Sequence, residues 1–270
     1  MPRFFEDLPP QVGDEFCLNA ENANHCAKAL RMKTGEHVCV CCGGTDYDCE
    51  IAEITENSVK CRAINSHKSD TEPSVFVTLY QCLPKGDKLE TVIQKSVELG
   101  VYKIQPVLSS RCISRPDDKK SAKKLERLCK IAKSACEQSG RGRIIDVCPT
   151  VSFDSAVKQA AAADLAIMFY EGGGKPLHRI FADYTGNASN NNGTNSTNDS
   201  SGTSGTNGIN GTGGSIAVLI GPEGGFSEDE VQKAAESGII AATLGRRILR
   251  TETAPLAALT AIMLLTGNLE

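Results

Sequence analysis

The spacing of apolar positions changes along the chain and divides it into two parts. In the first 70 or so residues, short runs rich in cysteine and β-branched residues at 36–42, 49–55 and 58–64 surround a Gly-Gly turn, which predicts strands and a hairpin. From residue 74 onward, apolar runs of strand length alternate with segments of helical period. We therefore expect a small N-terminal β-barrel over residues 1–71 and a parallel α/β domain over residues 72–270.

The alternation in the second part is regular enough to place its elements. Strands are predicted at 74–82, 101–108, 144–147, 165–170 and 216–220. Helices are predicted at 85–99, 121–139, 153–162, 176–181 and 254–265. The first of these helices has an apolar side made of Leu89, Val92, Ile93, Ser96 and Val97. Strands that alternate with helices favour a parallel sheet with helices packed on it.

Residues 185–214 interrupt this alternation. Gly, Asn, Ser and Thr occupy 27 of these 30 positions, a composition that cannot bury enough apolar surface to offset the entropy lost on ordering. We predict a disordered low-complexity insertion between a helix and the strand that follows it. Because the entropy of loop closure rises only logarithmically with length, we expect the fold to accept it.

The charges are unevenly placed. A net charge of -4 excludes a uniformly basic nucleic-acid binder. Residues 111–143, however, hold eleven Lys and Arg against four Asp and Glu, a balance of +7, whereas residues 1–70 hold seven against twelve, or -5. A basic stretch of this kind is typical of a solvated helix face and also of a surface that binds a polyphosphate.

The twelve cysteines are the unusual feature of the composition. Their irregular spacing and the absence of an apolar signal run favour reduced thiols over a disulfide framework. Cys39 and Cys42 formally give Cys-x-x-Cys, but no second pair follows, so buried thiols are favoured over a metal site. No apolar stretch approaches the roughly 18 residues that span a bilayer. We expect a cytoplasmic protein without a metal or a membrane partner.

Two glycine-containing segments near the C-terminus carry the candidate chemistry. Residues 219–227, Leu-Ile-Gly-Pro-Glu-Gly-Gly-Phe-Ser, follow an apolar strand and lead into a helix that Ser227 can cap. Residues 244–254, Leu-Gly-Arg-Arg-Ile-Leu-Arg-Thr-Glu-Thr-Ala, precede a helix that Thr253 can cap, with Pro255 in its first turn. Glycine permits close backbone approaches that a side chain would block, so each segment can wrap a ligand or simply form a tight turn.

This pair of segments resembles the RsmE-type branch of the SPOUT RNA methyltransferases. The run Gly172–Gly174 after a strand is similar to the first knot loop of that family, and Glu137–Arg141 and Pro2–Phe5 match it as well. The resemblance implies an N-terminal PUA-like RNA-binding barrel and a SPOUT domain with a C-terminal trefoil knot. It also implies a homodimer that binds S-adenosylmethionine and methylates N3 of a specific uridine in small-subunit (16S) ribosomal RNA, either free or in the assembled small subunit.

The resemblance implies site residues too. Those around the cofactor would be Leu219, Ile220, Gly221, Glu223, Gly224, Leu244, Gly245, Ile248 and Leu249. Arg250 is the first candidate to neutralise charge that develops on the uracil, and Glu252 is a weaker candidate as proton acceptor. A structural ion pair between Arg250 and a nearby glutamate explains these residues equally well. The RNA contacts would be Arg3, Arg31, Arg111, Arg115, Gln138 and Arg141.

Other functions are less consistent with the motifs. Lys175 is followed by Pro176 instead of Ser or Thr, which excludes a Walker motif, and no Gly-x-Gly-x-x-Gly opens a helix after an early strand. ATP and NAD are therefore not expected as cofactors. A noncatalytic RNA-binding or ribosome-assembly factor, or a SPOUT enzyme that acts on another RNA, are the alternatives. Retention of both glycine segments favours the ribosomal RNA methyltransferase.

Overall fold

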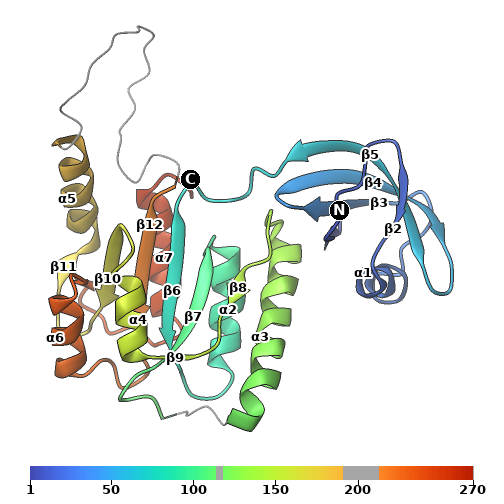
Figure 1. Cartoon of the computed structure of the whole chain (residues 1–270). Coiled ribbons are helices and arrows are strands. Elements are labelled where there is room, and N and C mark those ends of the chain that lie inside the picture. The colour runs from blue at the N-terminus through green and yellow to red at the C-terminus, as the bar shows by residue number, and fades with distance from the viewer. Residues whose placement is uncertain (114–117, 191–212, 270) are drawn as a thin grey trace, which may run out of the picture. The chain divides into compact units, whose positions relative to one another are not determined.

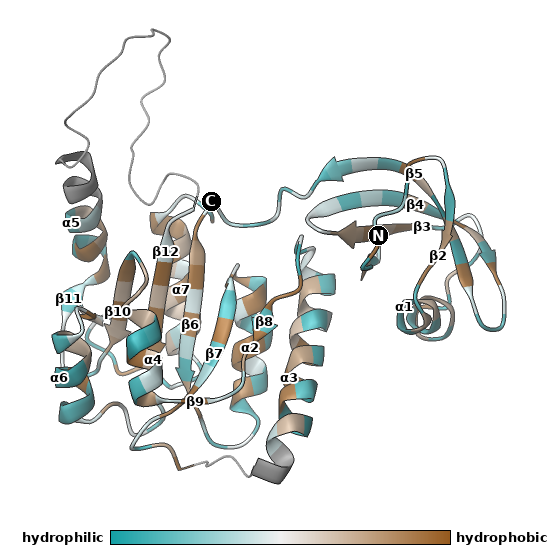
Figure 2. Ribbon diagram, in the orientation of Figure 1, coloured by the Kyte–Doolittle hydropathy of each residue, from teal (hydrophilic) through white to brown (hydrophobic). Residues whose placement is uncertain are grey.

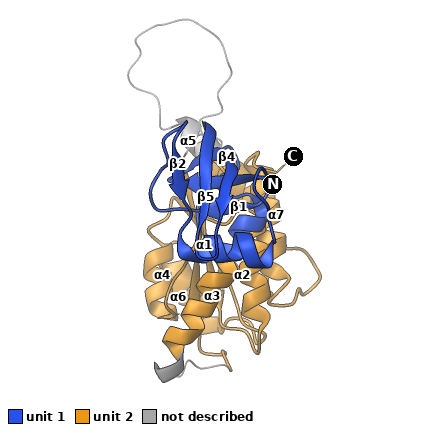
Figure 3. Cartoon of the chain, turned by 90° about the vertical axis from the view of Figure 1, so that its right-hand side faces the viewer, with its two compact units in different colours: residues 1–72, 133–144 blue, residues 73–132, 145–270 orange. Residues whose placement is uncertain are grey.

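The fold is that of a computed structural model, which describes residues 1–113, 118–190 and 213–269. Contacts divide the chain into two compact units (Figures 1 and 3). The N-terminal unit consists of residues 1–72 together with 133–144, and the C-terminal unit consists of residues 73–132 and 145–270. The N-terminal unit therefore also takes in the end of the basic helix, which the sequence analysis placed in the second domain.

The N-terminal unit is built on a five-stranded mixed sheet. Its strands are β1 (Arg3–Phe5), β2 (Glu15–Cys17), β3 (His37–Cys42), β4 (Thr45–Ile54) and β5 (Val59–Lys68). Their order is β1-β3-β4-β5-β2, with β1 parallel to β3 and the other pairs antiparallel. A short helix, α1 (Ala20–Asn24), runs directly into the π-helical turn η1 (His25–Ala29). The predicted strands are confirmed, and closure of the sheet into a barrel stays a prediction.

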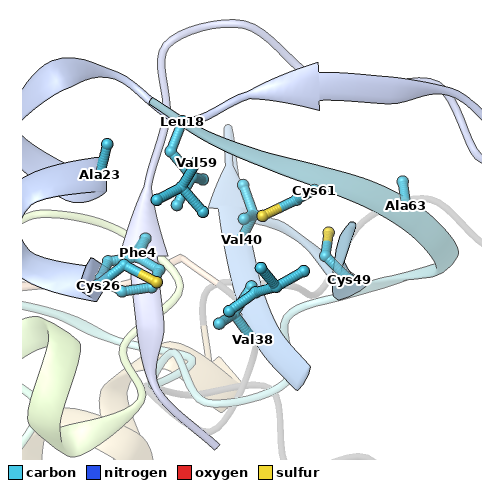
Figure 4. Packing of buried hydrophobic residues seen from close by; sticks show 11 residues of the cluster. Phe4, Leu18, Ala23, Cys26, Val38, Val40, Cys49, Val59, Cys61 and Ala63 are labelled. Carbon is cyan, nitrogen blue, oxygen red and sulfur yellow. The ribbon is translucent and has the colours of Figure 1, made fainter. Parts of the chain in front are cut away.

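The core of this unit is made of small apolar side chains and thiols. Figure 4 shows Cys26, Cys49 and Cys61 among the aliphatic residues, and all three are fully buried. Burial raises the pKa of Cys49 and of Cys61 to about 12, so both remain protonated thiols. None of the twelve cysteines forms a disulfide. In this core cysteine acts as a small hydrophobic residue.

Two of the ion pairs within the N-terminal unit involve predicted RNA contacts. Arg3 donates from both terminal nitrogens to Asp46, at 2.7 and 2.6 Å. Arg141 donates through Nε and Nη2 to Glu72, at 2.8 and 2.7 Å, and its side chain is only 3% exposed. Carboxylates inside the fold thus occupy both guanidinium groups, which disfavours direct RNA contacts by Arg3 and Arg141.

The ion pair of Asp46 makes the stability of this unit depend on pH. Burial alone raises the pKa of Asp46, but hydrogen bonds from Arg3 and Cys41 and nearby positive charge outweigh it, so the folded pKa lies below 3.8. A group with a lowered folded pKa stabilises the protein above its unfolded pKa and loses that contribution as the pH falls. We expect the wild-type Tm to drop more than that of Asp46→Asn between about pH 7 and about pH 3. Equal drops in the Tm of the two proteins, measured by thermal unfolding, would contradict this expectation.

The C-terminal unit contains an eight-stranded sheet in which every pair is parallel. Its strands are β6 (Phe76–Cys82), β7 (Lys103–Leu108), β8 (Asp146–Val147), β9 (Val151–Ser152), β10 (Leu165–Phe169), β11 (Lys175–Pro176), β12 (Ser215–Ile220) and β13 (Ile240–Thr243). The order is β11-β13-β10-β12-β6-β7-β8, and β9 also pairs with β7. This confirms the predicted parallel α/β architecture.

Helices cover both faces of this sheet. They are α2 (Lys88–Glu98), α3 (Asp118–Ser139), α4 (Phe153–Ala160), α5 (Leu177–Asn190), α6 (Glu228–Glu236) and α7 (Ala254–Leu265). Helices α2 and α7 pack together on one face, and α4 and α6 pack together on the other (Figure 1). Figure 2 shows that apolar residues are concentrated in β10, β12 and α7, which form the middle of the unit. None of the helices in the described ranges has the length and apolar character needed to cross a membrane.

Several local predictions can be compared with the structure. The five residues expected on the apolar side of α2 are its buried residues, and Ser227 caps α6 in a capping box with Glu230. Thr253 does stand at the N-cap of α7, but it makes no side-chain capping hydrogen bond, so its predicted role is corrected. Helix α5 continues past residue 185, where the predicted insertion begins, and residues 191–212 lie outside the described residues. Disorder of the insertion stays a prediction.

Candidate active site

The candidate site lies in the C-terminal unit, at the carboxyl edge of its sheet. Three loops leave this edge next to each other, because β10 pairs with both β12 and β13. They are loop A (170–174) after β10, loop B (221–227) after β12 and loop C (244–253) after β13. Carboxyl edges of parallel strands are where open α/β sheets bind ligands.

These loops enclose a cavity of about 500 Å³. The predicted cofactor residues that line it are Ile220, Gly221, Glu223, Gly224, Leu244, Gly245, Ile248 and Leu249. Leu219 does not line the cavity, because it is buried within β12 opposite Met168 of β10 and Tyr80 of β6. A volume of this size accommodates a ligand of nucleoside dimensions.

Glycine is favoured at two positions of loop B. A Cβ on Gly221 would lie 3.2 Å from the backbone of Gly225, and a Cβ on Gly225 would overlap the carboxylate of Glu171. Gly225 also has a φ of 65°, which favours glycine. The tight fold of loop B therefore depends on these residues and gives the cavity a wall of backbone.

A buried hydrogen-bond chain joins loops B and C to the sheet. The Thr251 hydroxyl donates to the Gly221 carbonyl at 2.8 Å and accepts from Nε2 of Gln81 at 3.2 Å. Gln81 lies in β6 with no exposed surface, and its Nε2 also donates to the Cys82 carbonyl. Thr251 thus holds loop C against loop B over a fixed point of the sheet.

Replacement of Thr251 by valine tests this chain. The variant keeps the side-chain shape but leaves the Gly221 carbonyl without its hydroxyl donor, and Nε2 of Gln81 keeps only the Cys82 carbonyl of its two acceptors. We expect Thr251→Val to lower the free energy of unfolding by about 1–3 kcal/mol, measured by denaturant titration. Thr251→Ser retains the hydroxyl and serves as the control. A valine variant as stable as the serine variant would contradict a stabilising role of the Thr251 hydroxyl.

Lys88 brings together acidic residues of loops B and C. Its ammonium donates to Glu223 at 3.1 Å and lies 3.1 Å from an oxygen of Glu252. The proximity of these two carboxylates raises the pKa of Lys88. The pKa of Glu252 is lowered, first by its own backbone N–H and also by Lys88. A carboxylate with a lowered pKa is a weaker proton acceptor, so this geometry favours a structural partner of Lys88 over a general base at position 252.

Loop C presents positive charge to the cavity. Arg246, Arg247 and Arg250 all line it and are exposed, and no ion pair or side-chain hydrogen bond involves Arg250 in the described part of the chain. The alternative of a structural ion pair from Arg250 to a glutamate is therefore not observed among these residues. Ile248 also lines the cavity and is 82% exposed, unusual for a large apolar side chain. The opening combines unpaired cations with an apolar surface.

The loop after β7 is fixed to loop B. Arg111 donates to the Gly224 carbonyl at 2.9 Å. Glu230 of α6 joins the same two loops, because its carboxylate accepts from the backbone N–H groups of Ser110 and Ser227. Arg111 is exposed and so remains accessible beside the cavity. Among the other predicted RNA contacts, Arg31 and Gln138 are exposed in the N-terminal unit, and Arg115 lies outside the described residues.

Lys88, Thr251 and the pair Arg246–Arg247 line the cavity but were not predicted as site residues. The position of Lys88 had a usable signal, because it follows β6 at the carboxyl edge that carries the other loops. Thr251 had no such signal, since its hydrogen-bonding role depends on Gln81, which lies in a distant part of the sequence. In the described residues, no group of three or more His, Cys, Asp or Glu side chains is placed to hold a metal ion.

Comparison with known proteins identifies the family. A model of the RNA methyltransferase domain matches residues 71–263, and a model of the RNA methyltransferase PUA domain matches residues 18–64. The ribosomal RNA small subunit methyltransferase E of Bacillus subtilis is 34% identical, over 97% of this chain and 96% of its own length. The chain belongs to the ribosomal RNA small subunit methyltransferase E family.

Solved structures of methyltransferases are similar over the whole chain. The family member from Neisseria gonorrhoeae, bound to S-adenosyl methionine, has a TM-score of 0.80 and 32% identity, and the match covers 98% of each chain. A putative methyltransferase from Legionella pneumophila, in complex with the same cofactor, has a TM-score of 0.79 and 29% identity over 97% of this chain and 96% of that one. The PUA-like unit and the parallel α/β unit are thus the architecture of this family.

Proposed function

We propose that the protein transfers a methyl group from S-adenosylmethionine to N3 of a specific uridine in small-subunit ribosomal RNA. The observation that carries this proposal is the cavity between loops B and C, with the unpaired Arg250 at its opening. Family membership supports the same activity, since the relatives are named for ribosomal RNA methylation and two similar structures are named as complexes with the cofactor.

The residues present fit S-adenosylmethionine. The cavity volume of about 500 Å³ lies in the range of ligand sites. Close backbone packing at Gly221 and Gly225 leaves peptide groups to face an adenosine, and Ile220, Leu244 and Leu249 give apolar walls. When bound, S-adenosylmethionine supplies an electrophilic methyl group on a sulfonium. The cofactor residues proposed here are therefore the predicted set without Leu219.

The cations around the cavity suit the chemistry of uracil. N3 of uracil is nucleophilic only once its proton is lost or the negative charge on the flanking oxygens is stabilised. Arg250 is unpaired and can donate to a uracil oxygen or to a phosphate, and Arg246 and Arg247 add positive potential at the same opening. We propose Arg250 as the catalytic residue and assign Glu252 to the positioning of Lys88.

RNA binding and assembly follow from the same family assignment. We propose that Arg31, Arg111, Arg115 and Gln138 contact RNA and that the PUA-like sheet closes into a barrel. We further propose that the C-terminal segment forms a trefoil knot and that the protein is a cytoplasmic homodimer. An apolar cavity lined by Leu177, Leu264 and Leu265 supports the dimer, because the last two side chains are exposed on α7.

The test is transfer of a labelled methyl group to purified small ribosomal subunits, with naked ribosomal RNA as the comparison. We expect incorporation at N3 of one uridine, identified by mass spectrometry of nucleosides. Cofactor binding without transfer to either substrate would indicate a different RNA. Absence of both binding and transfer would favour a noncatalytic RNA-binding or assembly factor.

A further inference from the structure

Lys88 lies between loops B and C, both of which are distant from it in sequence. It is the first residue of α2, the helix that follows β6 in sequence, and its side chain is 32% exposed and lines the cavity. Its two acidic partners come from different walls of the cavity: Glu223 from loop B and Glu252 from loop C. One ammonium group therefore connects both loops to a third element, the start of α2.

The two carboxylates need this cation. Since each has an oxygen 3.1 Å from the same nitrogen, these oxygens are at most about 6 Å apart. Like charges at such a distance repel each other unless a cation lies between them. The Lys85 backbone N–H also donates to Glu223, but this contact does not reach Glu252. In the described residues, Lys88 is the side chain that forms an ion pair with both.

We propose that Lys88 is a positioning residue for the cofactor: its ammonium holds loops B and C at the spacing that binds S-adenosylmethionine. This inference rests on the proposed function, because the ligand of the cavity is taken from it. Lys88 acts through Glu223 and Glu252 and not on the reacting atoms. Its loss should therefore weaken cofactor binding more than it slows methyl transfer at saturating cofactor.

The experiment compares Lys88→Met with Lys95→Met. Lys95 lies on the same helix and forms a surface ion pair with Glu98, its one ion-pair partner among the residues that the structure describes, so it controls for the loss of a lysine from α2. We expect Lys88→Met to raise the Kd for S-adenosylmethionine by about tenfold or more in isothermal titration calorimetry, with kcat changed less than about threefold. Lys95→Met should bind as the wild type does, and Lys88→Arg should restore most of the affinity. An unchanged Kd in Lys88→Met would overturn the proposal.

A double-mutant cycle separates positioning from general stability. If Lys88 acts through the acidic pair, Lys88→Met should cost little further affinity in a protein that already carries Glu223→Gln and Glu252→Gln. Additive losses would contradict the bridge. The Glu223→Gln, Glu252→Gln protein also keeps the test decisive if Lys88→Met does not fold, because it removes the same ion pairs from the other side. Failure of the wild type to bind the cofactor would instead refute the proposed function, a result distinct from an unchanged Kd in the variant.

Discussion

Arg250→Ala is expected to reduce methyl transfer to small ribosomal subunits by about 100- to 1000-fold, the range found when a preorganised donor to developing charge is removed. The guanidinium has no ion pair among the described residues and lines the cavity, so its charge is available to a bound base. The measurement is single-turnover transfer of labelled methyl at saturating cofactor. Cofactor Kd should change little, because loops B and C are held by Thr251 and Lys88 instead.

Arg250→Lys is the matched variant. It keeps the positive charge but loses the planar set of donors, and we expect an intermediate rate. Transfer by Arg250→Ala within a few-fold of the wild type would remove Arg250 from the catalytic role. Parallel loss of cofactor affinity and rate in both variants would indicate a structural contribution to the cavity wall.

Gly174→Ala is expected to lower the free energy of unfolding by about 3 kcal/mol or more and to abolish cofactor binding. Gly174 has a φ of 155°, and an added Cβ would lie 2.7 Å from the carbonyl carbon and oxygen of Ala241. Those atoms belong to β13, which is paired with both β10 and β11 and cannot yield. Backbone strain and overpacking each cost about 1–3 kcal/mol.

The adjacent glycine provides the control for this substitution. Gly173 also has a positive φ, of 121°, but an added Cβ there meets nothing within 4 Å. Gly173→Ala should therefore introduce backbone strain without a steric clash and lower the free energy of unfolding by about 1 kcal/mol. Urea unfolding of the two variants side by side gives the comparison. Equal losses would mean that the close packing of loop A on β13 contributes nothing.

Local patterns in the sequence predicted the elements well. The buried side of α2 follows from apolar periodicity, the bounds of α7 follow from a continuous apolar run with Pro255 in its first turn, and the capping box at Ser227 follows from short-range chemistry. The two glycine segments located the cavity because backbone approach restricts loop residues strongly. What the pattern could not provide was the partner of each charged side chain.

The ion pairs show why local patterns cannot identify the partner of a charged side chain. Arg3 and Arg141 are of the residue type that commonly contacts RNA. In the structure they pair with carboxylates that are 43 and 69 residues away in sequence. Lys88 and Glu223 are 135 residues apart. No periodicity encodes such pairs, because they form only when the sheet order is set. Leu219 was predicted to line the cavity but does not, for a simpler reason. Alternate residues of a strand face opposite sides of the sheet, and a motif that spans the end of the strand does not tell these sides apart.

The central pairing of the sheet has a consequence for how the chain acquires its structure. Strand β6, at residues 76–82, lies between β7 and β12, and β12 is supplied by residues 215–220. Pairings so distant in sequence give a high contact order, which slows folding. During synthesis one edge of β6 stays without its neighbour until most of the polypeptide has left the ribosome. The protein therefore completes its sheet late in its own translation.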